Sequence, residues 1–212
     1  MKQRHVNTQQ LNQLETRFRT HLINSLGGFK SVVLIGTINE AGQSNLAIFN
    51  SIVHLGANPA LIGFILRPDS VERHTWNNIE KNGYYTINHI HEGIYQQAHQ
   101  ASAKYPSHVS EFLEVGLTEE YKAGIKAPFV KESVVQLGVT FEQRIPIELN
   151  GTSLVIGRIK DLYFPDDCLG EDGFVDLSQA GTLAGSGLDG YFKTNRVARM
   201  SYAKVGASVS EI

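Results

Sequence analysis

A loop with two arginines carries the strongest chemical signal in the sequence. The segment 67–75, RPDSVERHT, follows a predicted strand and brings two guanidinium groups and two hydroxyl groups together. Pro68 cannot continue strand pairing, and a helix is expected to begin near Arg73. The first N–H groups of a helix lack partners within it and attract anions. Arg67, Arg73 and Thr75 would therefore suit a phosphomonoester, whose dianion needs several charged donors once it leaves water.

The same loop has a simpler interpretation, as a surface loop whose arginines pair with Asp69 and Glu72. The residues alone leave both interpretations open. A nearby predicted strand carries small polar residues in quick succession, namely Ser44, Asn45, Asn50 and Ser51. Short side chains let a backbone approach a flat ring, and amide and hydroxyl groups can bond to the polar edge of that ring.

Three other motifs favour structural roles. The string GSGLDG at 185–190 matches a dinucleotide-binding pattern, but no buried strand precedes it and only 22 residues follow, so we expect a flexible glycine-rich loop. His89 and His91 share one face of a predicted strand, with His99 as a conceivable third metal ligand, yet hydrogen-bonded histidines are commoner and we assign no metal. Cys168 lies among acidic residues that would raise its pKa, which disfavours nucleophilic catalysis.

Composition excludes several classes of protein. The chain has 212 residues, 42% hydrophobic and 19% charged, with a net charge of −2, so no global basic field exists for a nucleic acid or an anionic membrane. Its single cysteine cannot form an intrachain disulfide. The longest strongly apolar run, ALIGFIL at 60–66, is too short to cross a bilayer. We therefore expect a cytoplasmic protein.

Patterning predicts a mainly β chain with helical insertions. The β-favouring runs are 31–37, 44–55, 60–66, 84–90, 134–141 and 153–164. Short connections make them antiparallel neighbours, and Gly157 suggests a bulge. Alternation between 134 and 141 predicts one buried and one solvent-facing side. The expected helices are one from about Thr8 to Leu26, a short one near 73–83, and a polar helical excursion after Glu92.

These elements suggest a closed or nearly closed antiparallel barrel rather than a doubly wound sheet. We expect residues 1–212 to form a single domain, with an N-terminal helical segment at 1–28 and a helical insertion, or lid, at 92–130.

Two runs of the sequence resemble a known protein family. The runs VVLIGTINEAGQSNLAIFNSIVHLGANPALIGFILRP and RHTWNNIEKNGYYTINHI are similar to the flavin reductase-like, FMN-binding split-barrel flavoproteins. The likeness covers about 30–110 and resumes in GFVDLSQAGTLAGSGLDGYF near the carboxyl end. It implies an α+β, mainly antiparallel split β-barrel of the FMN-binding type. It also implies a homodimer with FMN at the subunit junction.

The resemblance assigns cofactor-binding residues in three groups. Lining the isoalloxazine ring and ribityl chain are Asn45, Ala47, Phe49, Asn50 and Ser51. Binding the phosphate are Arg67, Arg73, His74 and Thr75, and Asn88 is a lesser contact near the ring. The insertion AHQASAKYPSH would cover the flavin, with His99 and Lys104 as candidates for that lid.

The expected function is that of an FMN-binding oxidoreductase, an NAD(P)H-dependent flavin reductase that transfers hydride from NADH or NADPH to FMN. We assign no catalytic acid or base, because the cofactor carries the chemistry. The alternative is an FMN-holding electron carrier or redox sensor without its own nicotinamide site. A third, weaker hypothesis is a metal-dependent enzyme built on the histidines. Expected partners are the nicotinamide nucleotide and a monooxygenase or other electron acceptor.

Overall fold

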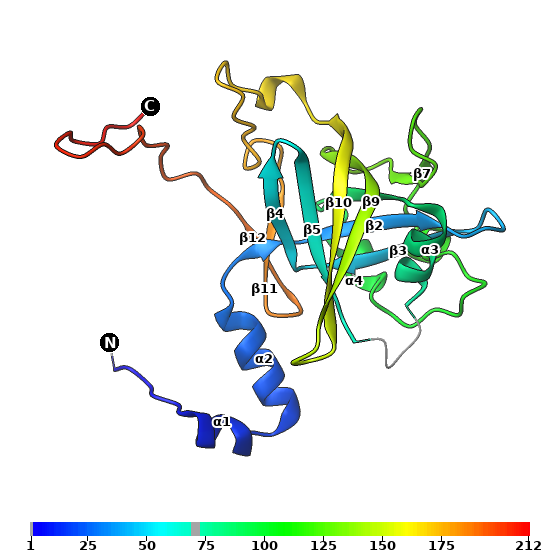
Figure 1. Ribbon diagram of the computed structural model, residues 1–212, viewed down its shortest axis with the longest axis horizontal. Coiled ribbons are helices and arrows are strands. Elements are labelled where there is room, and N and C mark those ends of the chain that lie inside the picture. The colour runs from blue at the N-terminus through cyan, green and yellow to red at the C-terminus, as the bar shows by residue number, and fades with distance from the viewer. Residues whose placement is uncertain (1, 69–72) are drawn as a thin grey trace.

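The centre of the molecule is a seven-stranded antiparallel sheet in the order β3-β2-β6-β9-β10-β5-β4 (Figure 1). The computed structural model describes residues 2–68 and 73–212. The strands of this sheet are β2 (Val33–Ile38), β3 (Ser44–Phe49), β4 (Ile52–Ala57), β5 (Ala60–Leu66), β6 (Tyr84–His89), β9 (Gln136–Ile147) and β10 (Thr152–Tyr163). The mainly β, antiparallel architecture predicted from the sequence is confirmed.

The sheet curls because its two edges are joined by a very short link. β3 and β4 lie at opposite ends of the strand order, yet only Asn50 and Ser51 separate them in the chain. Two residues span only about 7 Å, so the edges must meet at this end. Ile65 N–H donates to the Ser51 carbonyl at 3.0 Å. The predicted single strand 44–55 is therefore wrong, since the chain passes from one edge of the barrel to the other in its middle.

The barrel interior is filled by fully buried apolar side chains, among them Val33, Ile35, Phe64, Tyr85 and Val139. They come from β2, β5, β6 and β9, whose inward-facing residues meet there.

The outer face of β9 differs from the prediction of a solvent-facing side. Gln136 and Gly138 are buried because the segment before β9 packs over them. Gln136 Nε2 donates to the Val130 carbonyl at 2.6 Å, and Lys122 Nζ donates to Gln136 Oε1. Val130 belongs to β8 (Phe129–Val130), which pairs with β7 (Glu119–Glu120) in a small separate sheet.

Three helices pack on the barrel. α3 (His74–Asn82) ends at Gly83, which has φ 72°, as the Asn-Gly signal predicts. α4 (Tyr95–Gln100) and α5 (Glu111–Val115) cover one face of β3, where Ala98 and Phe112 pack in one cluster with Leu46. The predicted helical excursion is therefore mostly irregular chain with two short helices.

The N-terminal segment is two helices rather than the predicted one. α1 (Thr8–Gln13) begins at Asn7 with a capping box, but the chain is extended at Leu14. α2 (Thr16–Leu26) then starts anew because the Glu15 carboxylate accepts the N–H groups of Arg17 and Phe18, both at 2.9 Å. Neither helix buries a residue, and both extend away from the barrel (Figure 1). No helix in the described part of the chain is long and apolar enough to span a membrane.

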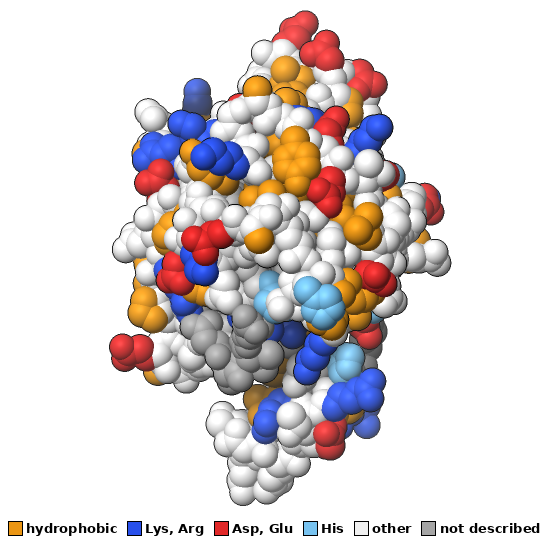
Figure 2. Space-filling model, turned by 90° about the vertical axis from the view of Figure 1, so that its right-hand side faces the viewer, with side chains coloured by type: hydrophobic (Ala, Val, Ile, Leu, Met, Phe, Trp, Pro, Cys, Tyr) orange, Lys and Arg blue, Asp and Glu red, His pale blue; other side chains and the backbone are white. Residues whose placement is uncertain are grey.

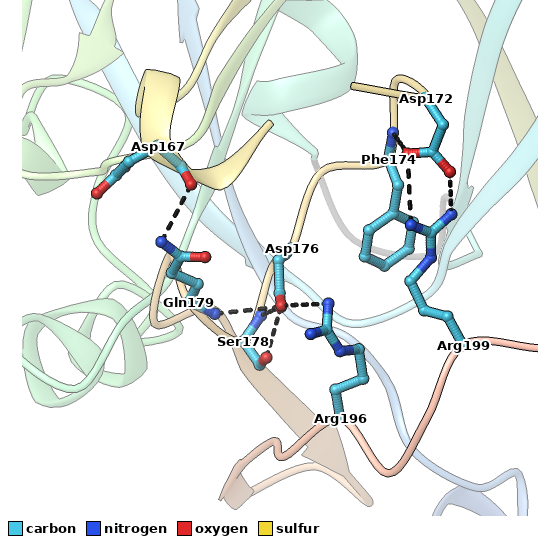
Figure 3. Close-up of polar contacts among 8 residues, drawn as sticks. All are labelled: Asp167, Asp172, Phe174, Asp176, Ser178, Gln179, Arg196 and Arg199. Carbon is cyan, nitrogen blue, oxygen red and sulfur yellow. Dashed lines mark hydrogen bonds and ion pairs between the residues drawn. The ribbon is translucent and has the colours of Figure 1, made fainter. Parts of the chain in front are cut away.

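A second sheet joins β1 (Lys30–Ser31) to two strands near the C-terminal end, β11 (Leu183–Ser186) and β12 (Gly190–Lys193). The predicted flexible glycine loop at 185–190 is thus part of an ordered hairpin. Two ion pairs then attach the tail to the preceding loop, one from Arg196 to Asp176 at 2.8 Å and one from Arg199 to Asp172 (Figure 3). The arginine hydrogen bond holds the pKa of Asp172 below its ordinary value.

The β9–β10 ladder contains the bulge predicted at Gly157. A Cβ at this position would lie 2.2 Å from Tyr85 Oη and 2.5 Å from Val139 Cγ1. We expect Gly157→Ala to lower the free energy of unfolding by about 1–3 kcal/mol, because the core must shift to admit a methyl group. Urea denaturation followed by circular dichroism measures this change.

Gly27→Ala is the matched control, since its φ is −64° and the nearest atom to a new Cβ is 3.6 Å away. Its effect should stay within about 0.5 kcal/mol. Equal stability of the two variants would contradict the tight packing of Tyr85 against β10.

Candidate functional site

A cavity of about 770 Å³ lies where β3, the start of α3, the segment 101–105 and the β11–β12 hairpin meet. This volume falls in the range of small-molecule sites. Nine of the ten predicted cofactor-binding residues line it, namely Asn45, Ala47, Phe49, Asn50, Ser51, Arg67, Arg73, His74 and Thr75. On the face drawn in Figure 2, His side chains lie in the lower half beside several Lys and Arg side chains, and a further group of Lys and Arg side chains lies at the upper left.

Buried hydrogen bonds fix one wall of the cavity. Asn45 Nδ2 donates to Thr37 Oγ1 and to Thr75 Oγ1, each at 3.2 Å, and Asn78 Nδ2 donates to Thr37 Oγ1 at 3.1 Å. All four side chains are buried. They connect β3 to the first turn of α3, so the polar residues of the strand and the start of the helix keep a fixed relative position.

β3 is an edge strand, and its outer edge faces the cavity. Among the described strands only β2 pairs with it, and the Leu46 N–H, which points away from β2, donates to the Glu111 carboxylate at 3.0 Å. Outward-pointing N–H groups recur at every second residue of an antiparallel edge. The Ile48 N–H therefore points to the same side, and Ile48 lines the cavity. A planar ligand with an acceptor atom can bond to this edge.

The guanidinium of Arg73 is held beside the cavity with an unmet hydrogen bond. Its Nη2 donates to the Pro68 carbonyl at 3.3 Å, while its buried Nε has no partner among the described residues. A buried donor without an acceptor is costly, so an acceptor from a ligand would stabilise it. As the N-cap residue of α3, Arg73 also makes no side-chain capping bond, which leaves the first turn open to an anion.

Arg67 is exposed at the cavity mouth and forms no ion pair within residues 2–68 and 73–212. The alternative in which it pairs with Asp69, or Arg73 with Glu72, lies outside the described residues.

One acidic residue, Glu111, lines the same cavity. Glu111 is only 6% exposed, and burial raises the pKa of its carboxyl group. The Leu46 N–H and the nearby His74 act in the opposite direction and favour the carboxylate. Sequence reasoning missed Glu111 because it lies in a polar stretch whose local pattern gives no sign of contact with β3.

The facing wall comes from the insertion and the β11–β12 hairpin. Asn50 Nδ2 donates to the Gly187 carbonyl at 2.7 Å and so holds the hairpin against the end of β3. His99 Nδ1 lies 2.9 Å from Tyr191 Oη, and the Tyr191 ring also packs on Tyr95 with centroids 5.6 Å apart. Of the two predicted lid residues, Lys104 lines the cavity directly, while His99 acts by holding Tyr191, which does line it.

The structure separates Asn88 from the other predicted site residues, which corrects its assignment near a ring. Its side chain is fully buried, donates to the Leu34 carbonyl and to Thr86 Oγ1, and accepts the Val130 N–H. Through these hydrogen bonds, the Asn88 amide connects β6 to β2 and β8. Asn88 is therefore a structural residue in this fold.

The remaining candidates also have local partners. His89 lies 3.2 Å from Thr182 Oγ1, and burial lowers its pKa to about 4, whereas His91 Nε2 lies 2.8 Å from the Glu132 carbonyl. Over the described residues, no group of three His, Cys, Asp or Glu side chains could hold a metal ion. Burial, with Asp167 beside it, raises the pKa of Cys168 in the direction expected.

Comparison with known proteins gives three consistent findings. A split-barrel protein of Shewanella frigidimarina NCIMB 400, assigned as a flavin reductase, is 49% identical with a TM-score of 0.91, over 95% of this chain and all of that one. Component B of nitrilotriacetate monooxygenase from Bacillus cereus shares the fold, with a TM-score of 0.80 at 19% identity over 92% of this chain and 98% of its own. The uncharacterized protein BH2278 of Halalkalibacterium halodurans is 29% identical over 174 residues, which are 78% of this chain and 83% of that protein.

The fold is thus the split barrel that the sequence predicts. Residues 26–178 match the flavin reductase like domain, and this segment contains both the β3 edge and the arginine loop. The chain belongs to the flavin reductase-like family.

Proposed function

We propose that this protein binds FMN in the cavity and transfers hydride to it from NADH or NADPH. The observation that carries the proposal is the buried Arg73 Nε, which lacks a partner among the described residues and lines the cavity at the uncapped start of α3. A phosphate oxygen would satisfy this donor and the first-turn N–H groups together.

Different residues of the cavity would bind different parts of FMN. Arg73 and Arg67 would bind the phosphate, and Thr75 is positioned beside them by its bond from Asn45. The β3 edge from Ala47 to Ser51 would lie along the ring and ribityl chain, with the Ile48 N–H as a donor. When bound, FMN would supply a ring that accepts a hydride. The chain's part is to orient the two rings and to exclude water.

We also propose that the protein acts as a homodimer. α1 and α2 bury no residue, and Phe18, Ile23 and Leu26 are each more than half exposed on α2. Such an apolar face on a projecting helix suits a second copy of the chain. α2 also contributes Asn24 to the cavity, so a partner docked there would lie beside the bound ligand.

We propose that residues 1–212 form one functional domain. α2, the barrel, the insertion at 92–130 and the β11–β12 hairpin all contribute to one cavity.

We also propose a cytoplasmic location and an oxygenase partner. A lone cysteine fits the reducing cytoplasm. The fold shared with a monooxygenase component supports an oxygenase as one acceptor of reduced flavin.

The first test is an absorption spectrum of the protein with FMN. We expect stoichiometric FMN binding, followed by bleaching of the flavin band when NADH or NADPH is added without oxygen. Bound FMN that is reduced only by dithionite or by a partner protein would favour the electron carrier instead. Failure to bind FMN would exclude both functions.

A second test separates phosphate binding from ring binding. Arg73→Ala should weaken FMN by about 2 kcal/mol or more, roughly thirtyfold, because it removes a charged donor. Riboflavin, which has no phosphate, should lose far less affinity. Fluorescence titration measures both. Arg158→Ala, at a surface ion pair with Glu142 outside the cavity, is the matched control and should change neither affinity. Equal losses for FMN and riboflavin in Arg73→Ala would refute the phosphate assignment.

A third test addresses the dimer. Light scattering should give the mass of two chains for the wild type, and Leu26→Asp should shift it toward one, because a charge in an apolar interface is costly. Leu113→Asp on α5 is the control, since Leu113 is 78% exposed on a different surface and Leu26 is 74% exposed. A wild-type protein with the mass of one chain would contradict the shared interface.

A further inference from the structure

Besides the two arginines, the cavity is lined by a third cation, Lys104. Lys104 lines the cavity from the insertion, and its side chain forms no hydrogen bond or ion pair within the described parts of the chain. Arg67 and Arg73 reach the cavity from the end of β5 and the start of α3. The two sets of positive charge therefore come from unconnected elements.

β3 separates the two walls. Successive side chains of a strand point to opposite faces. Asn45 bonds to Thr75 on one face, whereas Leu46 and Ile48 pack with Ala101 on the other. Ala101 begins the segment that leads to Lys104, so Lys104 comes to the cavity from the side of β3 on which α4 packs, whereas the arginines come from β5 and α3. Because the arginines would bind the phosphate of FMN, Lys104 is left for a different anionic group.

The wall that carries Lys104 includes an aromatic ring held by neighbouring side chains. Tyr191 lines the cavity and is held by His99 and Tyr95. Gln100 Nε2 donates to Tyr105 Oη at 3.0 Å, which connects the end of α4 to the residue after Lys104. The nearest buried acid of the cavity, Glu111, is occupied by the Leu46 N–H. A flat face beside a cation recognises a planar, negatively charged molecule.

We propose that Lys104 and Tyr191 form a second subsite, which binds a planar substrate carrying negative charge, and that Lys104 determines its selectivity. This inference rests on the proposed function, in which the arginine wall holds FMN. Two kinds of substrate share the chemistry. One is a dihydronicotinamide nucleotide, with a ring and phosphates, and the other is an aromatic carboxylate that receives electrons.

The test compares Lys104→Gln, Lys104→Arg and the control Lys131→Gln, an exposed lysine outside the cavity. FMN affinity is measured first and should stay within twofold in all variants. Steady-state reduction is then measured with NADH, NADPH and the uncharged donor 1-benzyl-1,4-dihydronicotinamide. If the nucleotide is the substrate of this subsite, Lys104→Gln raises the KM for NADH or NADPH at least fivefold. The same variant leaves the KM for the uncharged donor unchanged. Lys104→Arg, which keeps the charge, brings the KM for the nucleotide most of the way back to the wild-type value.

Benzoate distinguishes the second source. If the subsite takes an aromatic carboxylate, benzoate perturbs the spectrum of the FMN-bound wild type, and Lys104→Gln weakens this binding at least fivefold. Either pattern supports the proposal and names the substrate.

Three results would overturn the subsite: no change with any nucleotide or benzoate, an equal loss with the uncharged donor, or an equal loss of FMN affinity. Failure of the proposed function is seen separately, as a wild type that binds no FMN. In that case the affinity of the flavin-free protein for NADH is measured by fluorescence, and the same three variants are compared to decide whether the subsite exists.

Discussion

The open edge of β3 is the constraint on which the site depends. In a fully closed barrel both sides of every strand are paired. Here the two-residue link at Asn50 and Ser51 brings the sheet edges together at one end only, and β3 keeps one unpaired side. Two side-chain hydrogen bonds partly cover that unpaired side. Glu111 accepts the Leu46 N–H, and Asn50 bonds the β11–β12 hairpin, so the cavity occupies the stretch between these two contacts.

The electrostatics of the cavity are local rather than global. The chain has a net charge of −2, yet one cavity is lined by Arg67, Arg73 and Lys104 together with the buried acid Glu111. Burial strengthens the interaction of such groups with a bound anion, since the surrounding dielectric is lower than that of water. His74 lies near enough to Glu111 to favour its carboxylate form, so the wall is not uniformly positive. An anion is therefore attracted to particular positions in the cavity and not to the surface as a whole.

Ordered elements around the cavity replace what the sequence pattern suggested were flexible ones. The glycine-rich segment 185–190 forms strands because Gly185 pairs with Lys30 on β1 and with Tyr191 on β12. His89, which has with His91 a strand spacing suited to a metal, instead bonds to Thr182, and His99, the conceivable third ligand, bonds to Tyr191 of the same C-terminal region. In this way residues far apart in the chain hold the hairpin against the barrel. The tail beyond it is attached by Arg196 and Arg199.

Local chemistry in the sequence determined most strands of the barrel, the capped start of α1, the glycine end of α3 and the bulge at Gly157, because each depends on neighbours within a few positions. The small polar residues and the arginines within 44–75, together with the family resemblance that this stretch carries, pointed to nine of the residues that line the cavity. Tertiary structure alone decided which strand became the open edge, that Glu111 and Tyr191 reach the cavity, and that Asn88 does not. Those outcomes depend on contacts between residues 40 to 140 positions apart, such as Asn88 with Val130 and Asn50 with Gly187. No periodicity or motif records such contacts, since they exist only once the sheet has curled and the insertion has packed on β3.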